Sequence, residues 1–478
     1  MAIQINDVQM HVLNMRTRFP FRYGIASLVA LPHLFVRVEA EVDGTHSTGL
    51  ASDGLPPKWF TKNPETPFET DLNEMLTVIR NAVSIVLASG PANTVFDLWL
   101  RTYREQEQWA VGTDYPPLLW AFGVSLVERA AIDAACRASK TTFARAARDG
   151  SLGIRIDDIH PELGIGGPEE YLPGQPVRSV QVRHTVGLTD PLTDAEIPKD
   201  ERVSDRLPQS LEENIEIYGL THLKIKLRGD SDKDRARLKS IASLMAGRPC
   251  RFTLDGNEQY ADLSPFRDFW ESIRGDSALL PFLEGLMFVE QPLRRDVALS
   301  DDAQDAFANW SDRPPMIIDE SDGSLDSSRR ALDVGYVGTS HKNCKGVFKG
   351  IANACLMAKR QAESGKPHIL SSEDLANVGP VALTQDLAVL ATLGVDHSER
   401  NGHHYFAGLG MFPEDVQAQI AAHHTSLYRS TGSYPTLAVD SGRLDLSSVI
   451  DAPFGYTANL DTTRYTPLDD WSPATLDL

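Results

Sequence analysis

The sequence is short of cysteine, of long apolar runs and of positive charge. It has four cysteines, and their spacing matches neither a disulfide framework nor a metal-binding motif, so we expect reduced thiols. No run of 18 apolar residues occurs, which argues against a membrane-spanning helix. The 66 acidic residues outnumber the 46 basic ones, and the formal net charge is −20. This charge argues against nucleic acid or an anionic membrane as the main partner.

The first residues also lack a basic segment followed by an apolar stretch, and we therefore expect a cytoplasmic protein. What remains is ordinary globular composition. Of the 478 residues, 42% are hydrophobic and 23% are charged. A chain of this length can form two or three domains with a large core.

The first 150 residues have the pattern of a separate domain. Residues 34–42 alternate between apolar and polar as a half-buried strand does, and Asp43-Gly44 behind them is a hairpin turn. Residues 19–24 are aromatic and contain Pro and Gly, so they are predicted to form a loop. Two helical patterns follow, at 71–87 and 118–147. Strands followed by helices predict an α+β domain over residues 1–150.

Residues 151–410 alternate between short strands and helices, as an α/β domain does. The eight strand candidates lie at 179–186, 221–227, 252–255, 287–290, 316–319, 336–342, 368–372 and 395–399. Eight βα units of this size predict a TIM-type barrel, in which active residues sit at the C-terminal ends of the strands. The pattern decays after residue 410, so residues 411–478 are treated as a C-terminal segment.

A pair of lysines lies within the second of these strands. In Thr221–Leu227 the apolar residues fall on one side of an extended chain, and Lys224 and Lys226 fall on the other. An acidic residue ends each of the next three strands; these are Asp255, Glu290 and Asp319. Because the C-terminal ends of barrel strands meet at one mouth, the sequence predicts a cation site that faces a lysine base.

These residues also carry a family resemblance. The order Lys-x-Lys, Asp, Glu-Gln-Pro, Asp-Glu-Ser and a later strand-borne lysine resembles the enolase superfamily, in particular the muconate-lactonizing and dipeptide-epimerase branch of the mandelate racemase and muconate lactonizing enzyme family. The resemblance implies a modified (β/α)7–8 barrel with an N-terminal capping domain, completed by the C-terminal tail. It further implies Mg²⁺ held by Asp255, Glu290 and Asp319, bases Lys226 and Lys342 on opposite faces of the substrate, and a homo-oligomer.

The chemistry of these residue types agrees with such roles. Mg²⁺ prefers oxygen ligands, and three carboxylates leave coordination positions for a substrate carboxylate. A base must be neutral near pH 7, and we expect Lys224, next to Lys226, to help lower the pKa of that base together with the cation. Two alternatives stay open at this stage. Glu320 could replace Asp319 as a ligand, and Lys345 could replace Lys342 as the opposite-face base.

Substrate contacts are expected from two regions. Glu373, His397 and Glu399 come at or after the seventh and eighth strands, and Arg22, Tyr23 and Trp59 lie in the early loops that would cover the barrel. A mouth rich in His, Arg and Glu would suit a hydroxylated acid, whereas an apolar pocket would suit a hydrophobic acid.

The predicted function is Mg²⁺-dependent abstraction of the α-proton of a small carboxylate substrate. Lysines on both faces favour racemisation or epimerisation. The alternatives within enzymes are dehydration of an acid sugar and cycloisomerisation. The alternative of another class is a barrel that binds metal and ligand but performs no chemistry, which would have no use for two costly lysines facing a cation.

Overall fold

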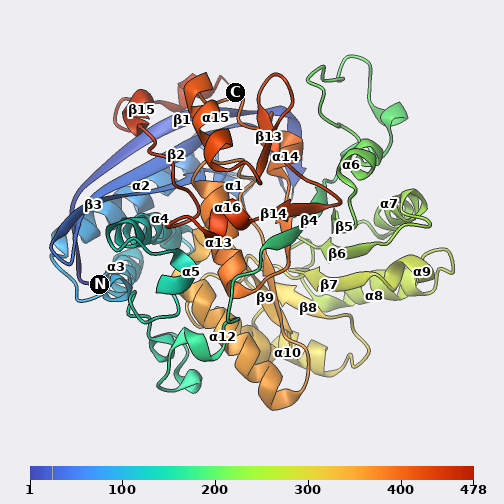
Figure 1. Cartoon of the computed structure of the whole chain (residues 1–478). Helices are drawn as coiled ribbons and strands as arrows, with labels where there is room; N and C mark the ends of the chain where they lie inside the picture. Colours follow the sequence, from blue (N-terminus) through green and yellow to red (C-terminus); the bar gives the residue numbers. More distant parts are fainter. Residues whose placement is uncertain (24, 478) are drawn as a thin grey trace.

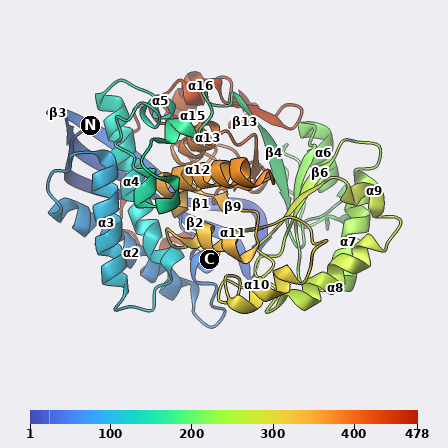
Figure 2. The ribbon, with the colours of Figure 1, turned by 90° about the horizontal axis from the view of Figure 1, so that it is seen from below.

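The computed structural model describes residues 1–23 and 25–477, and within these all side chains except those of Tyr23 and Ala26. It contains an antiparallel sheet with helices, formed by the N-terminal region, and a parallel barrel that follows it (Figures 1 and 2). The described part of the chain has no helix with the length and apolar character needed to cross a membrane.

The N-terminal sheet has the strand order β15-β1-β2-β3. Its long strands are β1 (Ile3–Tyr23), β2 (Ala26–Val42) and β3 (Thr45–Gly54). The predicted hairpin turn at Asp43-Gly44 is confirmed, and both residues have a positive φ, as a tight turn of this type requires. The predicted loop at 19–24 is wrong for residues 19–23, because β1 continues to Tyr23 and pairs with the start of β2. A register shift between Arg16 and Phe21 interrupts the pairing around Pro20, and Gly24 lies outside the described residues.

Helices pack on this sheet and connect it to the barrel. They are α1 (Pro57–Thr61), α2 (Phe68–Ala88), α3 (Val95–Ala110), α4 (Pro117–Ala138) and α5 (Phe143–Ala146). The helix α4 is apolar on nearly all sides and is buried along most of its length. Two of its charged residues make defined contacts: Arg129 pairs with Asp53 of β3 at 3.0 Å, and Glu128 accepts N–H groups of Val347 and Phe348 at the start of the barrel helix α12. The first contact joins α4 to β3 within the capping domain, and the second attaches the capping domain to the barrel.

All eight predicted barrel strands are present. They are β4 (Ser179–Val186), β5 (His222–Lys226), β6 (Arg251–Asp255), β7 (Leu286–Glu290), β8 (Met316–Ile318), β9 (Gly338–His341), β10 (Ile369–Ser372) and β11 (His397–Arg400). They pair in parallel in the order β10-β9-β8-β7-β6-β5-β4-β11. Between β10 and β11 the described residues form no ladder, and a Ser398 Oγ to Ser372 O hydrogen bond of 3.1 Å links them. The predicted barrel with an α+β cap is confirmed.

Helices follow most of these strands and cover the barrel (Figure 2). They are α6 (Leu211–Tyr218), α7 (Ser231–Leu244), α8 (Leu263–Arg274), α9 (Leu280–Leu283), α10 (Asp301–Ala308), α11 (Ser327–Val334), α12 (Val347–Ser364), α13 (Ala382–Leu393) and α14 (Gly402–Tyr405). Gly219, Gly335, Gly365 and Gly394 directly follow α6, α11, α12 and α13, all with positive φ.

The C-terminal segment contacts both parts of the molecule. Its elements are α15 (Glu414–His423), β12 (Tyr428–Ser430), β13 (Pro435–Leu437), β14 (Arg443–Asp445), α16 (Ser447–Ile450) and β15 (Thr466–Pro467). Strand β15 pairs with β1 and so completes the capping sheet, as the sequence analysis expected. Strand β14 pairs with β4 and adds an antiparallel strand to the barrel sheet, which was not expected.

Candidate active site

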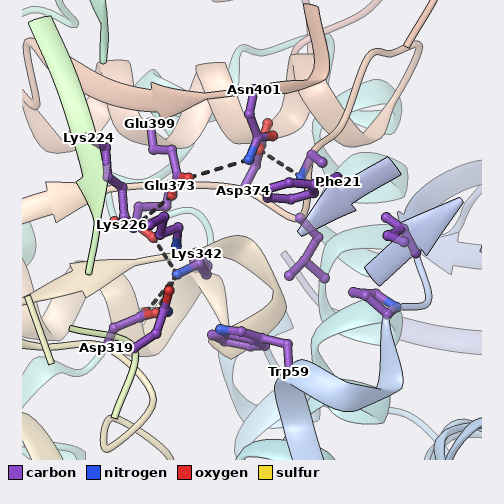
Figure 3. Close-up of a pocket in the computed structure, with 15 residues that line it drawn as sticks. Phe21, Trp59, Lys224, Lys226, Asp319, Lys342, Glu373, Asp374, Glu399 and Asn401 are labelled. Carbon is purple, nitrogen blue, oxygen red and sulfur yellow. Dashed lines mark hydrogen bonds and ion pairs between the residues drawn. The ribbon is translucent and has the colours of Figure 1, made fainter. Parts of the chain in front are cut away.

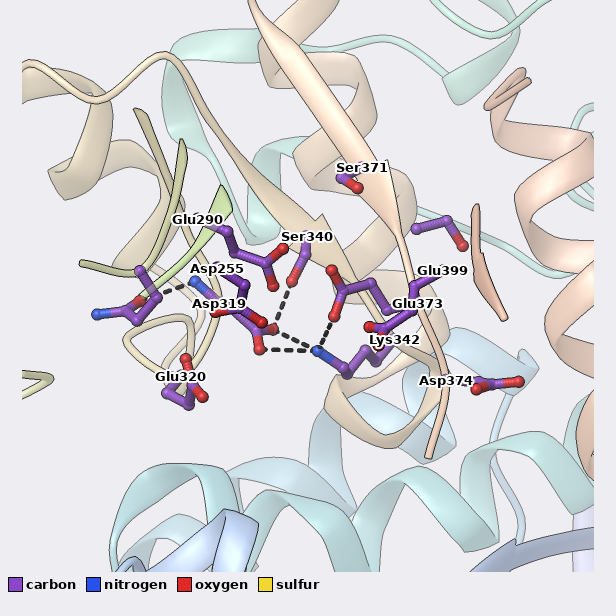
Figure 4. Close-up of polar contacts among 12 residues, drawn as sticks. Asp255, Glu290, Asp319, Glu320, Ser340, Lys342, Ser371, Glu373, Asp374 and Glu399 are labelled. Atoms are coloured by element: carbon purple, nitrogen blue, oxygen red, sulfur yellow. Dashed lines mark hydrogen bonds and ion pairs between the residues drawn. The ribbon is translucent and has the colours of Figure 1, made fainter. Parts of the chain in front are cut away.

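The register of the barrel strands aligns the predicted site residues. Lys226 pairs with Asp255, and Asp255 pairs with Glu290, so these three residues stand side by side at the C-terminal ends of β5, β6 and β7. Asp319 follows the last residue of β8 directly. A charged residue stands at or directly after the end of each strand. The β-branched and aromatic residues before it are buried in the barrel, and polar side chains lie at the barrel mouth. The charged residues therefore converge at one end of the barrel (Figure 4).

Lys224 and Lys226 point into this cluster of acids. Lys224 Nζ donates to Glu290 Oε1 at 2.9 Å, to Glu373 Oε1 at 2.6 Å and to Glu399 Oε2 at 2.8 Å. Lys226 Nζ donates to Asp255 Oδ2 at 2.6 Å. The six side chains are all buried, so the lysines hold the carboxylates as ion pairs shielded from water.

Lys342 reaches the same cluster from the other side. It follows β9, and its Nζ lies 2.7 Å from Asp319 Oδ1 and 2.6 Å from Glu373 Oε2. The Trp59 ring of the capping domain covers this ammonium, with the ring centroid 4.8 Å from Nζ. Figure 3 shows Lys342 between Asp319 and Trp59.

The alternative base Lys345 is placed differently. Its Nζ donates to the backbone oxygens of Asp319 and Ser340, each at 2.8 Å, and to Asp319 Oδ1 at 2.7 Å. These acceptors use the three N–H bonds of the ammonium group. Lys342 lines the cavity described below and Lys345 does not, so the geometry favours Lys342 as the group that could reach a substrate.

Arg183 of β4 is a member of the site that the sequence analysis missed. It is fully buried, and its guanidinium donates to Thr253 Oγ1 at 2.9 Å, to Ser371 Oγ at 2.7 Å and to Glu373 Oε1 at 3.4 Å. One signal was available: in Ser179–Val186 valines alternate with polar residues, as expected of a strand whose polar face points into a barrel.

In the described part of the chain the cluster contains as many acidic as basic side chains. Its carboxylates are Asp255, Glu290, Asp319, Glu373 and Glu399, and its cations are Arg183, Lys224, Lys226, Lys342 and Lys345. Every lysine of the cluster contacts at least one of these carboxylates. A buried network of this kind is tolerated because its members are paired and hydrogen-bonded to each other.

A cavity opens above the cluster, between the barrel mouth and the capping domain (Figure 3). Lys224, Lys226, Asp319, Lys342 and Glu373 are among the residues on its charged side. Its other side is apolar and is formed by Phe21, Leu28, Pro56, Trp59, Leu375 and Ala376. Trp59 belongs to α1, so the capping domain contributes part of the wall, as the sequence analysis proposed for this residue.

No protein-family model matches the sequence, and no curated protein matches it. Solved structures do match. A mandelate racemase/muconate lactonizing protein from Herpetosiphon aurantiacus superposes with a TM-score of 0.59 at 16% identity over 95% of this chain and 99% of the other. The dipeptide epimerase of Enterococcus faecalis V583, complexed with Mg and the dipeptide L-Leu-L-Tyr, has a TM-score of 0.60 at 14% identity and coverages of 95% and 100%. The muconate lactonizing enzyme of Pseudomonas fluorescens, complexed with muconolactone, has a TM-score of 0.56 at 15% identity and coverages of 95% and 97%.

These neighbours are enzymes of the enolase superfamily. The chain has the enolase-superfamily fold. At 14–16% identity the comparison establishes the architecture, and the roles of individual residues have to be argued from the site itself.

In this enolase-superfamily barrel, the protein residues alone, without a cation, do not lower the pKa of Lys226 or Lys342. Burial lowers the pKa of Lys226, but the charges of Asp255, Glu399 and Glu290 oppose burial, and the pKa lies above its ordinary value. Burial likewise opposes the charges of Asp319 and Glu373 at Lys342, whose pKa is well above its ordinary value. The charge of Lys224 does lower the pKa of Lys226, as expected, but the neighbouring carboxylates outweigh it, so the expected net lowering needs the charge of a bound cation.

Three carboxylates of this fold are close enough to share a cation. Glu290, Asp319 and Glu373 each place an oxygen within 4.8 Å of the other two. Oε2 of Glu290 is buried and has no hydrogen-bond partner among the described residues, which costs free energy unless a ligand occupies it. Burial and the nearby Glu373 charge raise the pKa of Glu290 well above its usual range. A divalent cation with a preference for oxygen ligands fits this set.

Two predicted ligands lie outside that group of three. Asp255, expected as the third ligand, accepts hydrogen bonds from Lys226 at Oδ2 and from the Asn257 backbone N–H at Oδ1. Glu320, the alternative to Asp319, accepts from Asn257 Nδ2 at 3.1 Å, and burial together with the Asp319 charge raises its pKa to about 7. Glu373 takes the place in the group that the sequence analysis gave to Asp255.

Some of the predicted substrate-contact residues line the cavity, and others lie elsewhere. Glu373 and Glu399 line the cavity. His397 does not, because it is the first residue of β11 and lies at the opposite end of the barrel, beside Gln181. Arg22 is exposed and donates to Thr189 Oγ1 at 3.1 Å, and it does not line the cavity either. The Tyr23 side chain lies outside the described residues.

Proposed function

We propose that this protein is a Mg²⁺-dependent enzyme of the enolase superfamily that abstracts the α-proton of a small carboxylate substrate, with racemisation or epimerisation as the reaction. One observation carries the proposal. Lys226 and Lys342 line the same buried cavity from β5 and from the end of β9, and the three strands between them carry Asp255, Glu290 and Asp319. Two lysines thus flank a row of carboxylates.

Such an arrangement supplies a proton acceptor on one face of an α-carbon and a proton donor on the other. The Nζ of one lysine, when neutral, removes the proton, and the Nζ of the opposite lysine, as an ammonium, returns one. Glu290, Asp319 and Glu373, together with the predicted ligand Asp255, are the residues available to hold the cation. When bound, the cation would polarise the substrate carboxylate and, through its positive charge, lower the pKa of the adjacent lysines. Trp59 excludes water from Lys342.

The alternatives of the same superfamily are elimination from an acid sugar and cycloisomerisation, and both start with the same proton abstraction. A barrel that only binds a ligand would not need Lys226 and Lys342 in the cavity wall, where both are buried at a cost in solvation. The neighbour complexed with magnesium and mandelic acid and the one complexed with Mg and a dipeptide support the cation and the substrate class.

We also propose a cytoplasmic homo-oligomer that binds neither nucleic acid nor membranes, in keeping with the net charge of −20.

The function is tested by proton exchange in D₂O. The purified protein is incubated with a panel of carboxylic acids, including amino-acid derivatives, dipeptides and acid sugars, with Mg²⁺ or with EDTA. We expect deuterium to enter the α-position of at least one acid, by NMR, only when Mg²⁺ is present. The Lys239→Met variant, which changes an exposed lysine outside the cluster, is the control and should retain exchange. Inversion of the labelled product identifies an epimerase, and a keto-acid product identifies a dehydratase. Absence of exchange across the panel would contradict the proposal.

The cation site has its own test, which needs no substrate. We expect Glu290→Gln to weaken Mn²⁺ binding at least tenfold, measured by electron paramagnetic resonance of the free ion, because an amide oxygen carries no charge and the orphaned carboxylate oxygen is lost. Glu320→Gln is the matched control, since Glu320 is equally buried and adjacent to Asp319 but outside the group of three. Equal loss in both variants would contradict the assignment of Glu290.

A further inference from the structure

We infer that the substrate carries an apolar substituent and an uncharged hydrogen-bond donor beside its carboxylate, and that it is not a polyhydroxylated acid. This inference rests on the proposed function, because it takes the charged side of the cavity as the place where the carboxylate binds. It follows from what the rest of the cavity wall offers.

The wall opposite the charges is apolar. Phe21, Leu28 and Trp59 of the capping domain are each less than a tenth exposed, and Leu375 of the barrel is buried to the same degree. Pro56 and Ala376 complete this wall. Apolar side chains cannot form hydrogen bonds with hydroxyl groups, and a sugar chain placed against them would leave its hydroxyls unpaired. A substituent of aryl or branched alkyl type would bury its surface there instead.

Two acidic residues of the wall, Asp374 and Glu399, are already engaged. Asp374 is bound by Arg400 and accepts the Ala376 N–H at 2.9 Å. Glu399 is held by Lys224 at 2.8 Å and also accepts the Thr185 hydroxyl. A substrate with several hydroxyls or with an ammonium group would have to displace these partners. These acidic residues at the barrel mouth are therefore paired within the protein and are not free to bind a ligand.

Asn401 differs from these residues. Its Nδ2 donates to Glu399 Oε1 at 3.4 Å, and this contact fixes the amide orientation because a carboxylate oxygen only accepts. Its Oδ1 then has no hydrogen-bond partner in the part of the chain that the structure describes, although the side chain is only 3% exposed. An unpaired acceptor in the wall of a binding cavity matches one donor on the ligand, such as a hydroxyl or an amide N–H.

Calorimetric titration in the presence of Mg²⁺ tests this inference without requiring turnover. The ligands are 3-phenyllactate, 3-phenylpropanoate, lactate and gluconate. We expect 3-phenyllactate to bind at least tenfold more tightly than lactate or gluconate, because only it places a ring on the apolar wall. We expect it to bind about threefold to tenfold more tightly than 3-phenylpropanoate, which lacks the donor.

Two variants separate the two parts of the inference. Phe21→Ala should reduce the advantage of 3-phenyllactate over lactate by at least threefold, and Asn401→Leu should make 3-phenyllactate and 3-phenylpropanoate bind equally. His397→Gln, at the opposite end of the barrel, should change none of these ratios. Tighter binding of gluconate, or no binding of either phenyl acid, would overturn the inference. Binding with the expected ratios but without α-proton exchange would contradict the proposed function and leave the ligand class standing.

Discussion

The Lys226→Met and Lys342→Met variants are each expected to lose α-proton exchange with one enantiomer of a chiral substrate, and the two variants should lose opposite enantiomers. Each lysine approaches the cavity from its own side of the barrel, and each enantiomer presents its α-hydrogen to one side only. A positioned base contributes about 10²–10⁴-fold to a rate, and we expect losses of that size. Deuterium incorporation into each pure enantiomer, followed by NMR, measures the effect.

Both variants should remain folded, because each carboxylate keeps another partner. Asp255 retains Lys224 at 3.0 Å when Lys226 is replaced, and Asp319 retains Lys345 at 2.7 Å when Lys342 is replaced. Thermal unfolding followed by circular dichroism controls for misfolding. Exchange of both enantiomers in both variants would refute the assignment of the two bases. Loss of both enantiomers in a stable Lys342→Met variant would instead assign all proton transfer to that residue.

The free energy of unfolding is expected to fall steeply as the pH falls below about 6.5. Burial lowers the pKa of ten described histidines. For six of them the pKa falls to about 3 (His33, His184 and His397) or to about 4 (His222, His341 and His424). In the unfolded chain histidine titrates near 6.5, so below that pH the unfolded state binds more protons than the folded state and is favoured. The stability contribution is complete above about pH 6.5 and is lost as the pH approaches 3 to 4.

Each such histidine can lower the free energy of unfolding by up to about 1.4 kcal/mol per pH unit. If each of the six contributes half of this slope, the free energy of unfolding falls by about 4 kcal/mol per pH unit. Domains are typically stable by about 5–15 kcal/mol, so we expect unfolding near pH 5. Urea unfolding at pH 8.0, 6.5 and 5.5 measures the slope. His33→Gln should reduce the slope of the free energy of unfolding against pH by the equivalent of about one bound proton. His46→Gln is the control, because the His46 side chain is 72% exposed. A stability that stays constant between pH 8.0 and 5.5 would contradict the prediction.

The strands of the barrel could be predicted because their pattern is local. Apolar runs of four to eight residues alternate with helical segments, and the charged residue that ends each run marks the barrel mouth. Lys226, Asp255, Glu290 and Asp319 were found in this way, and the strand register then placed the first three side by side. Locally determined features of this kind need no knowledge of which segments meet.

Predictions that depended on exact strand ends were less successful. His397 lies at the start of β11 rather than near its end, so its side chain belongs to the opposite end of the barrel. The loop expected at residues 19–24 is largely strand, because pairing with β2 overrides the turn preference of Pro20. A shift of a few residues along a strand moves a side chain by a full barrel layer, and short patterns do not resolve that shift.

The sequence by itself determined the alternation of strands and helices, the acidic ends of three strands and the lysine pair, because these follow from periodicity along one segment. Only the tertiary structure decided which charges meet. It brought Arg183 of β4 and Glu373 of β10 into the cluster, turned Lys342 rather than Lys345 toward the cavity, and placed Phe21 and Trp59 over it. These relations join residues far apart in the chain, and their energies come from burial and from charge pairing across the barrel, which no local pattern records.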